Sequence, residues 1–251
     1  MLILRSLIYN VLFYLNTFLW LMVGLPTFLM SRHGILTVAK WWGRTNVWLM
    51  RVVCGTRVEF RGLEKIPPGP LLVAAKHQSA WETFALLSLF ADPVFILKRE
   101  LEWIPLFGWF LWKGEMIPID RGARAQALAA MTVRAQAALA EGRQIIIFPE
   151  GTRRAPGAEP AYKHGVAHLY AAAGVPCLPI ALNSGLFWRR RSFRRYPGTI
   201  RVEILDPIPP GLSKQAFFDR LRHDIETATN RLMEESARER GEPGIPDLAA
   251  T

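Results

Sequence analysis

The stretch that most narrowly constrains the fold is Ile145-Ile146-Ile147-Phe148-Pro149-Glu150-Gly151-Thr152-Arg153-Arg154. Its apolar half predicts a buried strand that stops at the proline, after which the chain presents a carboxylate, a glycine, a hydroxyl and two guanidiniums. Gly151 allows the backbone to approach a ligand closely, Thr152 can donate a hydrogen bond, and Arg153 can hold a phosphate bidentately. The alternative is an ordinary strand-to-loop turn with a local Glu–Arg ion pair.

Outward from this stretch, short β-branched runs alternate with helical patterns. The predicted strands span 57–61, 71–75, 94–98, 116–119, 144–148, 178–182 and 199–205. The predicted helices cover 79–90, 123–140, 165–173 and 214–237. This alternation predicts an α/β fold, with a mostly parallel or mixed sheet of about seven strands flanked by helices. We assign residues 56–237 to this domain and expect residues 238–251 to form a flexible tail.

Residues 1–55 have a different texture and predict a module of two membrane-associating helices. No charged residue occurs between Ser6 and Ser31, a run about as long as a helix needs to enter a bilayer. The pattern breaks at Gly24-Leu25-Pro26 and resumes as a second helix over 35–53. A basic stripe beside a tryptophan-rich apolar face suits a helix lying among lipid headgroups; its members are Lys40, Arg44 and Arg51. The alternative is a helix that packs on the core and exposes a solvated basic face.

The net charge of +10 indicates an anionic partner. No Asp or Glu precedes Glu59, so basic residues surround the apolar segment, as is typical of the cytoplasmic face of a membrane with anionic headgroups. Five arginines also fall within residues 189–195. Phe193 alone does not form the aromatic platform that nucleic-acid binding favours, so we expect no nucleic-acid partner. We also expect no metal site, because Cys54 and Cys177 lack ligand spacing and no carboxylate joins the histidine pair at 164 and 168.

The first candidate catalytic pair is His77 with Glu82, just after the strand at 71–75. Residues five apart in one helix lie about 140° apart, so these side chains meet only if His77 lies in a loop and Glu82 in a first helical turn. Ser79-Ala80-Trp81-Glu82 is also a capping box, which needs no catalysis. We expect the carboxylate of Glu82 to bind either the imidazole or the backbone N–H of Ser79. The pattern alone leaves the catalytic and the structural interpretation open.

A third strand end carries Asp120-Arg121 directly after Ile119. Alone, such a pair is more often a surface ion pair. Three predicted strands are each followed by charged or polar side chains. Functional sites in α/β sheets form at the carboxyl ends of the strands, so this recurrence favours a functional site over isolated surface ion pairs.

Four motifs together resemble the 1-acyl-sn-glycerol-3-phosphate acyltransferase family. In chain order they are His77-Gln78-Ser79-Ala80-Trp81-Glu82, Ile119-Asp120-Arg121, Phe148-Pro149-Glu150-Gly151-Thr152-Arg153 and Val175-Pro176-Cys177-Leu178-Pro179. Lys98-Arg99-Glu100-Leu101 resembles the family's stretch between the first two motifs, and the resemblance covers residues 57–210. The family's first motif usually ends in aspartate, so Glu82 changes the reach of the carboxylate by one methylene.

The resemblance implies transfer of a fatty acyl group from acyl-CoA or an acyl carrier protein to the sn-2 hydroxyl of lysophosphatidic acid, giving phosphatidic acid. It implies that His77 is the general base and that Glu82 orients and stabilises its imidazole. The residues implied to bind substrate are Lys98, Arg121, Glu150, Gly151, Thr152 and Arg153. No cofactor is implied beyond the thioester co-substrate. Three interpretations of the arginines at 189–195 stay open. They bind anionic lipid headgroups, they bind an acidic acyl carrier protein that acts as the donor, or they form a solvated basic loop without a specific partner.

Three alternatives stay open on the sequence. The acceptor is another lyso-lipid, or His77 activates water in a membrane-bound thioesterase, or the chain is a non-catalytic lipid-binding or carrier-docking module. A covalent acyl-enzyme is disfavoured because the chain has no Gly-x-Ser-x-Gly elbow.

Overall fold

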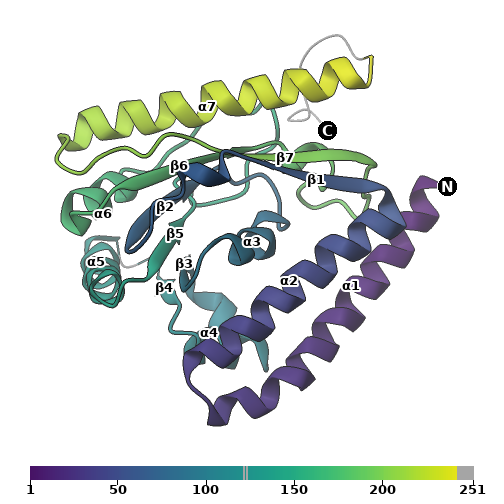
Figure 1. The fold of residues 1–251 in the computed structure, drawn as a ribbon, viewed down its shortest axis with the longest axis horizontal. Coiled ribbons are helices and arrows are strands. Elements are labelled where there is room, and N and C mark those ends of the chain that lie inside the picture. Colours follow the sequence, from purple (N-terminus) through teal and green to yellow (C-terminus); the bar gives the residue numbers. More distant parts are fainter. Residues whose placement is uncertain (121, 123, 242–251) are drawn as a thin grey trace.

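The computed structural model describes residues 1–120, 122 and 124–241, and Figure 1 shows how its elements are layered. Among these residues a seven-stranded sheet runs in the order β1-β7-β6-β2-β5-β3-β4. The strands are β1 (Thr56–Arg61), β2 (Leu71–Ala75), β3 (Pro93–Lys98), β4 (Ile117–Ile119), β5 (Gln144–Ile147), β6 (Cys177–Leu182) and β7 (Gly198–Ile204). Neighbouring strands pair in parallel, apart from the antiparallel pair β6 and β7. The predicted α/β fold with a mostly parallel sheet is confirmed.

Strands β2, β5 and β6 are buried along their whole length because helices cover both faces of the sheet. Side chains of β2 alternate between two cores: Leu71 and Val73 enter one, and Leu72 and Ala74 enter the other. The first core is also built from α1 (Leu2–Gly24), α2 (Arg32–Cys54) and α3 (Glu82–Ala85). The second is built from α5 (Arg124–Ala140), α6 (Gly165–Ala173) and α7 (Lys214–Glu239).

The predicted strands agree with the structure to within one residue at each end, whereas the helices differ more. Helix α2 begins at Arg32 rather than at residue 35, and α7 continues to Glu239 beyond its predicted end at residue 237. The helix predicted over 79–90 begins only at Glu82 and gives way to a 3₁₀ turn over Leu86–Leu89. It begins late because the side chain of Glu82 binds the backbone N–H groups of Gln78 and Ser79 and holds them in a turn. The short helix α4 (Phe107–Lys113) was not predicted, because its aromatic run shows no helical periodicity.

The N-terminal helices α1 and α2 pack against each other, and Figure 1 shows them side by side on the flank of the sheet away from α7. The predicted break is confirmed as a 3₁₀ turn over Leu25–Leu29. The hydroxyl of Thr45 accepts hydrogen bonds from Asn16 (2.9 Å) and Trp20 (3.0 Å) across the helix interface. A Cβ on Gly43 would lie 2.5 Å from the carbonyl oxygen of Phe84, so a glycine lets α2 lie directly on α3. The N-terminal helices therefore support the segment that carries Glu82.

The surface of this helix pair combines exposed apolar side chains with neighbouring basic ones, as where the guanidinium of Arg44 lies 5.2 Å from the ring centroid of Trp41. The segment Leu2–Leu29 is long and apolar enough to cross a membrane, and only 11% of its most apolar window is buried. On α2, Trp41 and Trp48 are exposed. The three residues of the basic stripe differ in their contacts. Lys40 donates to the carbonyl of Ala91 (2.7 Å), whereas Arg44 and Arg51 are exposed.

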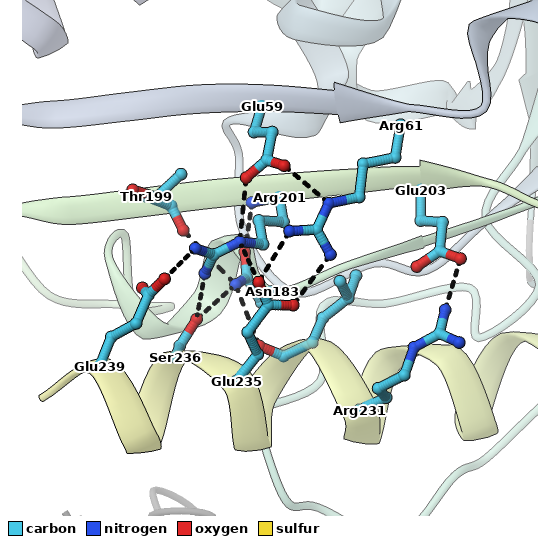
Figure 2. A network of polar contacts seen from close by, with 11 residues as sticks. Glu59, Arg61, Asn183, Thr199, Arg201, Glu203, Arg231, Glu235, Ser236 and Glu239 are labelled. Carbon is cyan, nitrogen blue, oxygen red and sulfur yellow. Dashed lines mark hydrogen bonds and ion pairs between the residues drawn. The ribbon is translucent and has the colours of Figure 1, made fainter. Parts of the chain in front are cut away.

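Helix α7 is tied to the edge of the sheet by a network of ion pairs (Figure 2). Arg201 on β7 is buried and contacts Glu59 on β1 (3.1 Å) and Glu235 on α7 (3.1 Å). Arg61 on β1 also binds Glu235 (2.7 Å). These ion pairs hold β1, β7 and α7 together at a distance from the predicted site. We therefore assign these charged residues a role in the stability of the fold and none in the site.

Candidate active site

Four neighbouring strands, β2, β5, β3 and β4, run in parallel and end at one edge of the sheet. The predicted site residues follow these ends: β2 leads to His77, β3 ends at Lys98, β4 leads to Asp120, and β5 leads to Glu150 and Arg153. The fold thus gathers segments that are far apart in the chain. Arg121, also predicted to bind substrate, lies outside the described residues.

The carboxylate of Glu82 is bonded to the imidazole ring of His77. The distance from Oε1 of Glu82 to Nδ1 of His77 is 2.9 Å. The same oxygen accepts the backbone N–H groups of Gln78 and Ser79, each at 2.7 Å. Oε2 accepts the hydroxyls of Ser79 (3.0 Å) and Ser184 (2.8 Å). A fully buried carboxylate is therefore saturated with donors.

These donors decide the charge of the pair. Burial by itself would raise the pKa of Glu82, but the hydrogen bond and charge of His77, with the donors from Ser79 and Ser184, hold that pKa below its ordinary value. Glu82 is therefore ionised at neutral pH and accepts a proton-bearing Nδ1. This tautomer leaves Nε2 of His77 as the basic nitrogen.

The expectation that Glu82 must choose between the imidazole and the N–H of Ser79 is wrong. A carboxylate oxygen has more than one lone pair, and Oε1 accepts both groups at once. The other half of the capping box differs too, because the hydroxyl of Ser79 accepts from the N–H of Trp81 (2.9 Å), one residue earlier than the pattern predicts. Glu82 thus shapes the turn and orients His77 with the same atoms.

Glu150 is buried behind the histidine, and both of its oxygens are bound within the protein. Oε2 accepts the backbone N–H of His77 (3.1 Å), and Oε1 accepts Nζ of Lys76 (2.9 Å). Lys76 is itself 3% exposed and also contacts Glu226 of α7 (2.6 Å), which accepts the hydroxyl of Tyr162 (2.8 Å). Burial raises the pKa of Glu150, although Lys76 and the N–H of His77 oppose the shift. The local Glu–Arg pair considered as an alternative is replaced by this Glu–Lys pair.

The loop after β5 presents its cations to the same region. The N–H of Gly151 donates to the carbonyl of Phe148 (2.9 Å), and Gly151 has a φ of +66°, where glycine is favoured. Thr152 and Arg153 follow this turn, and Lys163 is fixed beside it by a backbone bond to Pro149 (2.8 Å). Within the described part of the chain, no carboxylate pairs with the side chain of Arg153 or Lys163. Two uncompensated cations therefore face one space.

That space is a cavity of ≈ 920 Å³, lined by His77, Thr152, Arg153 and Lys163. Its apolar walls come from α1, α2 and α4 and include Trp20, Trp42, Phe107, Phe110 and Leu111. The aromatic run at 103–112 divides accordingly: Phe107 and Phe110 line the cavity, whereas Trp103, Trp109 and Trp112 are exposed. The cavity joins a basic, polar part at the strand ends to a long apolar part beneath the N-terminal helices.

Two other predicted features lie at the edge of this cavity. Lys98 lines it, and its ammonium group pairs with Glu100 at 2.7 Å. Asp120 also lines it and pairs with Arg99 at 3.3 Å, as a surface ion pair does.

Three residues that hold the site together were missed by the sequence interpretation. Phe148 stacks on the ring of His77, with centroids 4.0 Å apart and planes at 17°. Ser184 lies 102 positions from Glu82, so no local pattern could have paired them. Lys76 adjoins His77, and a lysine at the end of an apolar strand was a signal for a buried partner.

Comparison with known proteins identifies the family to which these motifs belong. A family model described as Acyltransferase matches residues 57–183. The chain is 41% identical over 201 residues to the 1-acyl-sn-glycerol-3-phosphate acyltransferase of Pseudomonas aeruginosa, covering 78% of each chain. It is 34% identical over 185 residues to the human 1-acyl-sn-glycerol-3-phosphate acyltransferase alpha, covering 71% of this chain and 65% of that one.

The chain belongs to the 1-acyl-sn-glycerol-3-phosphate acyltransferase family. The matched residues 57–183 include His77, Glu82 and the whole loop after β5. The fold is also that of the crystal structure of the 1-acyl-sn-glycerophosphate acyltransferase PlsC from Thermotoga maritima, with a TM-score of 0.78. That match is 23% identical and covers 92% of this chain and 98% of the other.

Proposed function

We propose that this acyltransferase transfers a fatty acyl group from an acyl thioester to the sn-2 hydroxyl of 1-acyl-sn-glycerol-3-phosphate, giving phosphatidic acid. The names of the relatives from Pseudomonas aeruginosa and human support this acceptor. The observation that carries the proposal is the His77–Glu82 pair at the junction of a basic and an apolar part of one cavity.

In the proposed reaction, Nε2 of His77 removes the proton of the acceptor hydroxyl while its oxygen attacks the thioester carbonyl. The resulting imidazolium is stabilised by the ionised Glu82 at Nδ1. The tetrahedral intermediate collapses, the carbon–sulfur bond breaks, and the departing thiolate takes the proton from Nε2. An ester and a free thiol result, and His77 returns to its starting state without a covalent acyl-enzyme.

The substrate groups fit the two parts of the cavity. The acceptor phosphate would lie against Arg153 and Lys163, with Thr152, Lys98 and the motif residue Arg121 as further contacts. The φ of Gly151 places the turn that presents these residues. We assign Glu150 a positioning role, because its oxygens hold the backbone of His77 and the side chain of Lys76. Acyl chains would occupy the apolar part between α1, α2 and α4.

We also propose that residues 1–55 bring the catalytic domain, residues 56–237, to the cytoplasmic face of the cell membrane. The exposed apolar face of α1 and the surrounding basic residues support this location. The donor there would be acyl-CoA or an acyl carrier protein.

The proposal is tested by one assay of the purified full-length protein with an acyl thioester, with and without lysophosphatidic acid. We expect thiol release that depends on lysophosphatidic acid and yields phosphatidic acid. Equal release of free fatty acid in both samples would instead identify a thioesterase. Release that requires a different lyso-lipid would retain the chemistry and reject the acceptor.

Two variants assign the roles within this assay. His77→Ala should lose at least about two orders of magnitude in rate, because general base catalysis contributes about 10²–10⁴-fold. Arg153→Gln should raise the KM for lysophosphatidic acid far more than the KM for the thioester. Arg220→Gln, on the exposed face of α7, is a matched control that should change neither.

A further inference from the structure

The arginine-rich stretch at 189–195 forms a hairpin whose base is buried against α1. Trp188 and Arg195 pair as an antiparallel bridge, and the N–H of Tyr196 donates to the carbonyl of Phe187 (2.9 Å). The guanidinium of Arg195 stacks on the indole of Trp188 at 4.0 Å and is only 5% exposed. One of the five arginines is therefore a structural residue and no part of a free basic surface.

Helix α1 holds this hairpin from the other side. The N–H of Arg195 donates to the hydroxyl of Ser6 (2.9 Å), and its guanidinium donates to the side-chain oxygen of Asn10 (2.8 Å). The amide nitrogen of Asn10 donates to the carbonyl of Phe193 (2.7 Å). These bonds fix the position of the hairpin tip relative to the apolar helix.

The tip combines an exposed aromatic ring with arginines that form no ion pair with a carboxylate among the described residues. Phe193 is 51% exposed, and it lies between Arg191 and Arg194 in the chain. No carboxylate pairs with Arg190, Arg191 or Arg194 within the described ranges. The tip therefore places a half-exposed phenyl ring among exposed arginines that no carboxylate of the described chain neutralises.

The tip lies beside exposed apolar residues of α1. Leu7 and Tyr14, about one turn before and after Asn10, are 55% and 71% exposed. Because Asn10 donates to the backbone carbonyl of Phe193, the hairpin tip, which carries an exposed phenyl ring and exposed arginines, is held beside these apolar residues of α1. Aromatic and apolar groups beside arginines are the pattern of a surface that enters the headgroup layer of a bilayer.

We propose that the hairpin tip at 189–194 is a second membrane contact, in which Phe193 enters the headgroup layer and the arginines bind anionic phospholipids. The inference rests on the proposed membrane location of the enzyme and adds a lipid preference to it. The tip is also joined to the site, because Nη1 of Arg190 donates to the backbone carbonyl of Arg153 (3.0 Å). The proposed membrane contact is therefore directly bonded to the segment proposed to hold the acceptor phosphate.

The test places an environment-sensitive fluorophore at the tip through Phe193→Cys in the full-length protein. Both native cysteines are buried, so labelling is selective. The labelled protein is reconstituted into nanodiscs of phosphatidylcholine alone or mixed with phosphatidylglycerol. We expect a blue shift in the anionic discs that high salt reverses. The same label at Ala216→Cys on α7, on the opposite side of the sheet in Figure 1, should show none.

Arg191→Gln with Arg194→Gln should then reduce docking of the labelled tip by about fivefold per neutralised arginine, the equivalent of about 1 kcal/mol per charge at an anionic surface. An unchanged spectrum in all discs, with acyl transfer intact, would overturn this inference and leave the proposed function standing. A spectral change caused by acyl carrier protein without anionic lipid would overturn it in favour of a protein partner. If the unlabelled wild type showed no acyl transfer, that result would contradict the proposed function and would not by itself contradict the membrane contact of the tip.

Discussion

Replacement of Glu82 by glutamine removes the negative charge of the side chain and keeps its size and shape. Oε1 of the amide can still accept the N–H groups of Gln78 and Ser79, and its nitrogen can donate to the hydroxyls of Ser79 and Ser184, which rotate to accept. The fold should therefore survive with a loss of about 1–3 kcal/mol, since hydrogen bonds to a charged acceptor are replaced by neutral ones.

The expected loss of activity is larger than the loss of stability and has an electrostatic origin. Glu82 contacts Nδ1 at 2.9 Å, so the centres of the two charged groups lie about 4 Å apart when His77 becomes an imidazolium. At an effective dielectric constant near 20, that attraction is worth about 4 kcal/mol. About 1.4 kcal/mol corresponds to tenfold in rate, so Glu82→Gln should lower kcat/KM by about 10³-fold.

The assay is acyl transfer to lysophosphatidic acid in detergent, with His77→Ala as the reference. Because Glu82 acts through His77, adding Glu82→Gln to His77→Ala should cost almost nothing further. Glu82→Asp keeps the charge but loses reach, so it should retain more activity and yet unfold more easily, because buried N–H groups lose their acceptor. A Glu82→Gln enzyme within tenfold of wild type would refute the electrostatic role.

The same carboxylate predicts a pH dependence of stability. The pKa of Glu82 is lower in the folded protein than its ordinary value, which is about 4.3 in an unfolded chain. The stabilisation is therefore fully present above that value and is lost as pH falls through the folded pKa. In urea unfolding, the difference in unfolding free energy between wild type and Glu82→Gln should be constant above about pH 5.5 and shrink below about pH 4.3.

Three further changes test how the site and the sheet are held. Lys76→Met leaves the buried carboxylate of Glu150 and the partly buried one of Glu226 without their cation, and thermal unfolding should reveal a loss of about 3–5 kcal/mol that adding Glu226→Gln partly restores. Gly151→Ala should cost about 1–2 kcal/mol because of its φ of +66°, and a circular dichroism melt would detect it. Arg201→Met should cost about 1–3 kcal/mol in urea unfolding while leaving kcat intact, since it lies in the network of Figure 2 and lines no part of the cavity.

The strands could be predicted because each is an apolar run closed by a local signal, as at Pro149. The position of His77 in a loop also follows from the sequence, since a five-residue spacing is incompatible with one helix. The donors to Glu82 could not be predicted in full, because Ser184 arrives from another strand end through the sheet order. The partner of Glu150 could not be predicted either, because the local sequence offers only neighbouring arginines, whereas the fold supplies Lys76 from the adjacent strand.

His77 is restrained at four of its groups before any substrate arrives. Glu82 holds Nδ1, Glu150 holds the backbone N–H, the N–H of Arg154 donates to the backbone carbonyl at 2.8 Å, and Phe148 covers one ring face. Such restraint lowers the entropy that must be lost on reaching the transition state. Three of these restraints come from the segment 148–154, whose motif resembles a substrate-binding loop. We therefore infer that this segment serves the base as much as the phosphate, so that a change at Glu150 should lower kcat more than it raises the KM for lysophosphatidic acid.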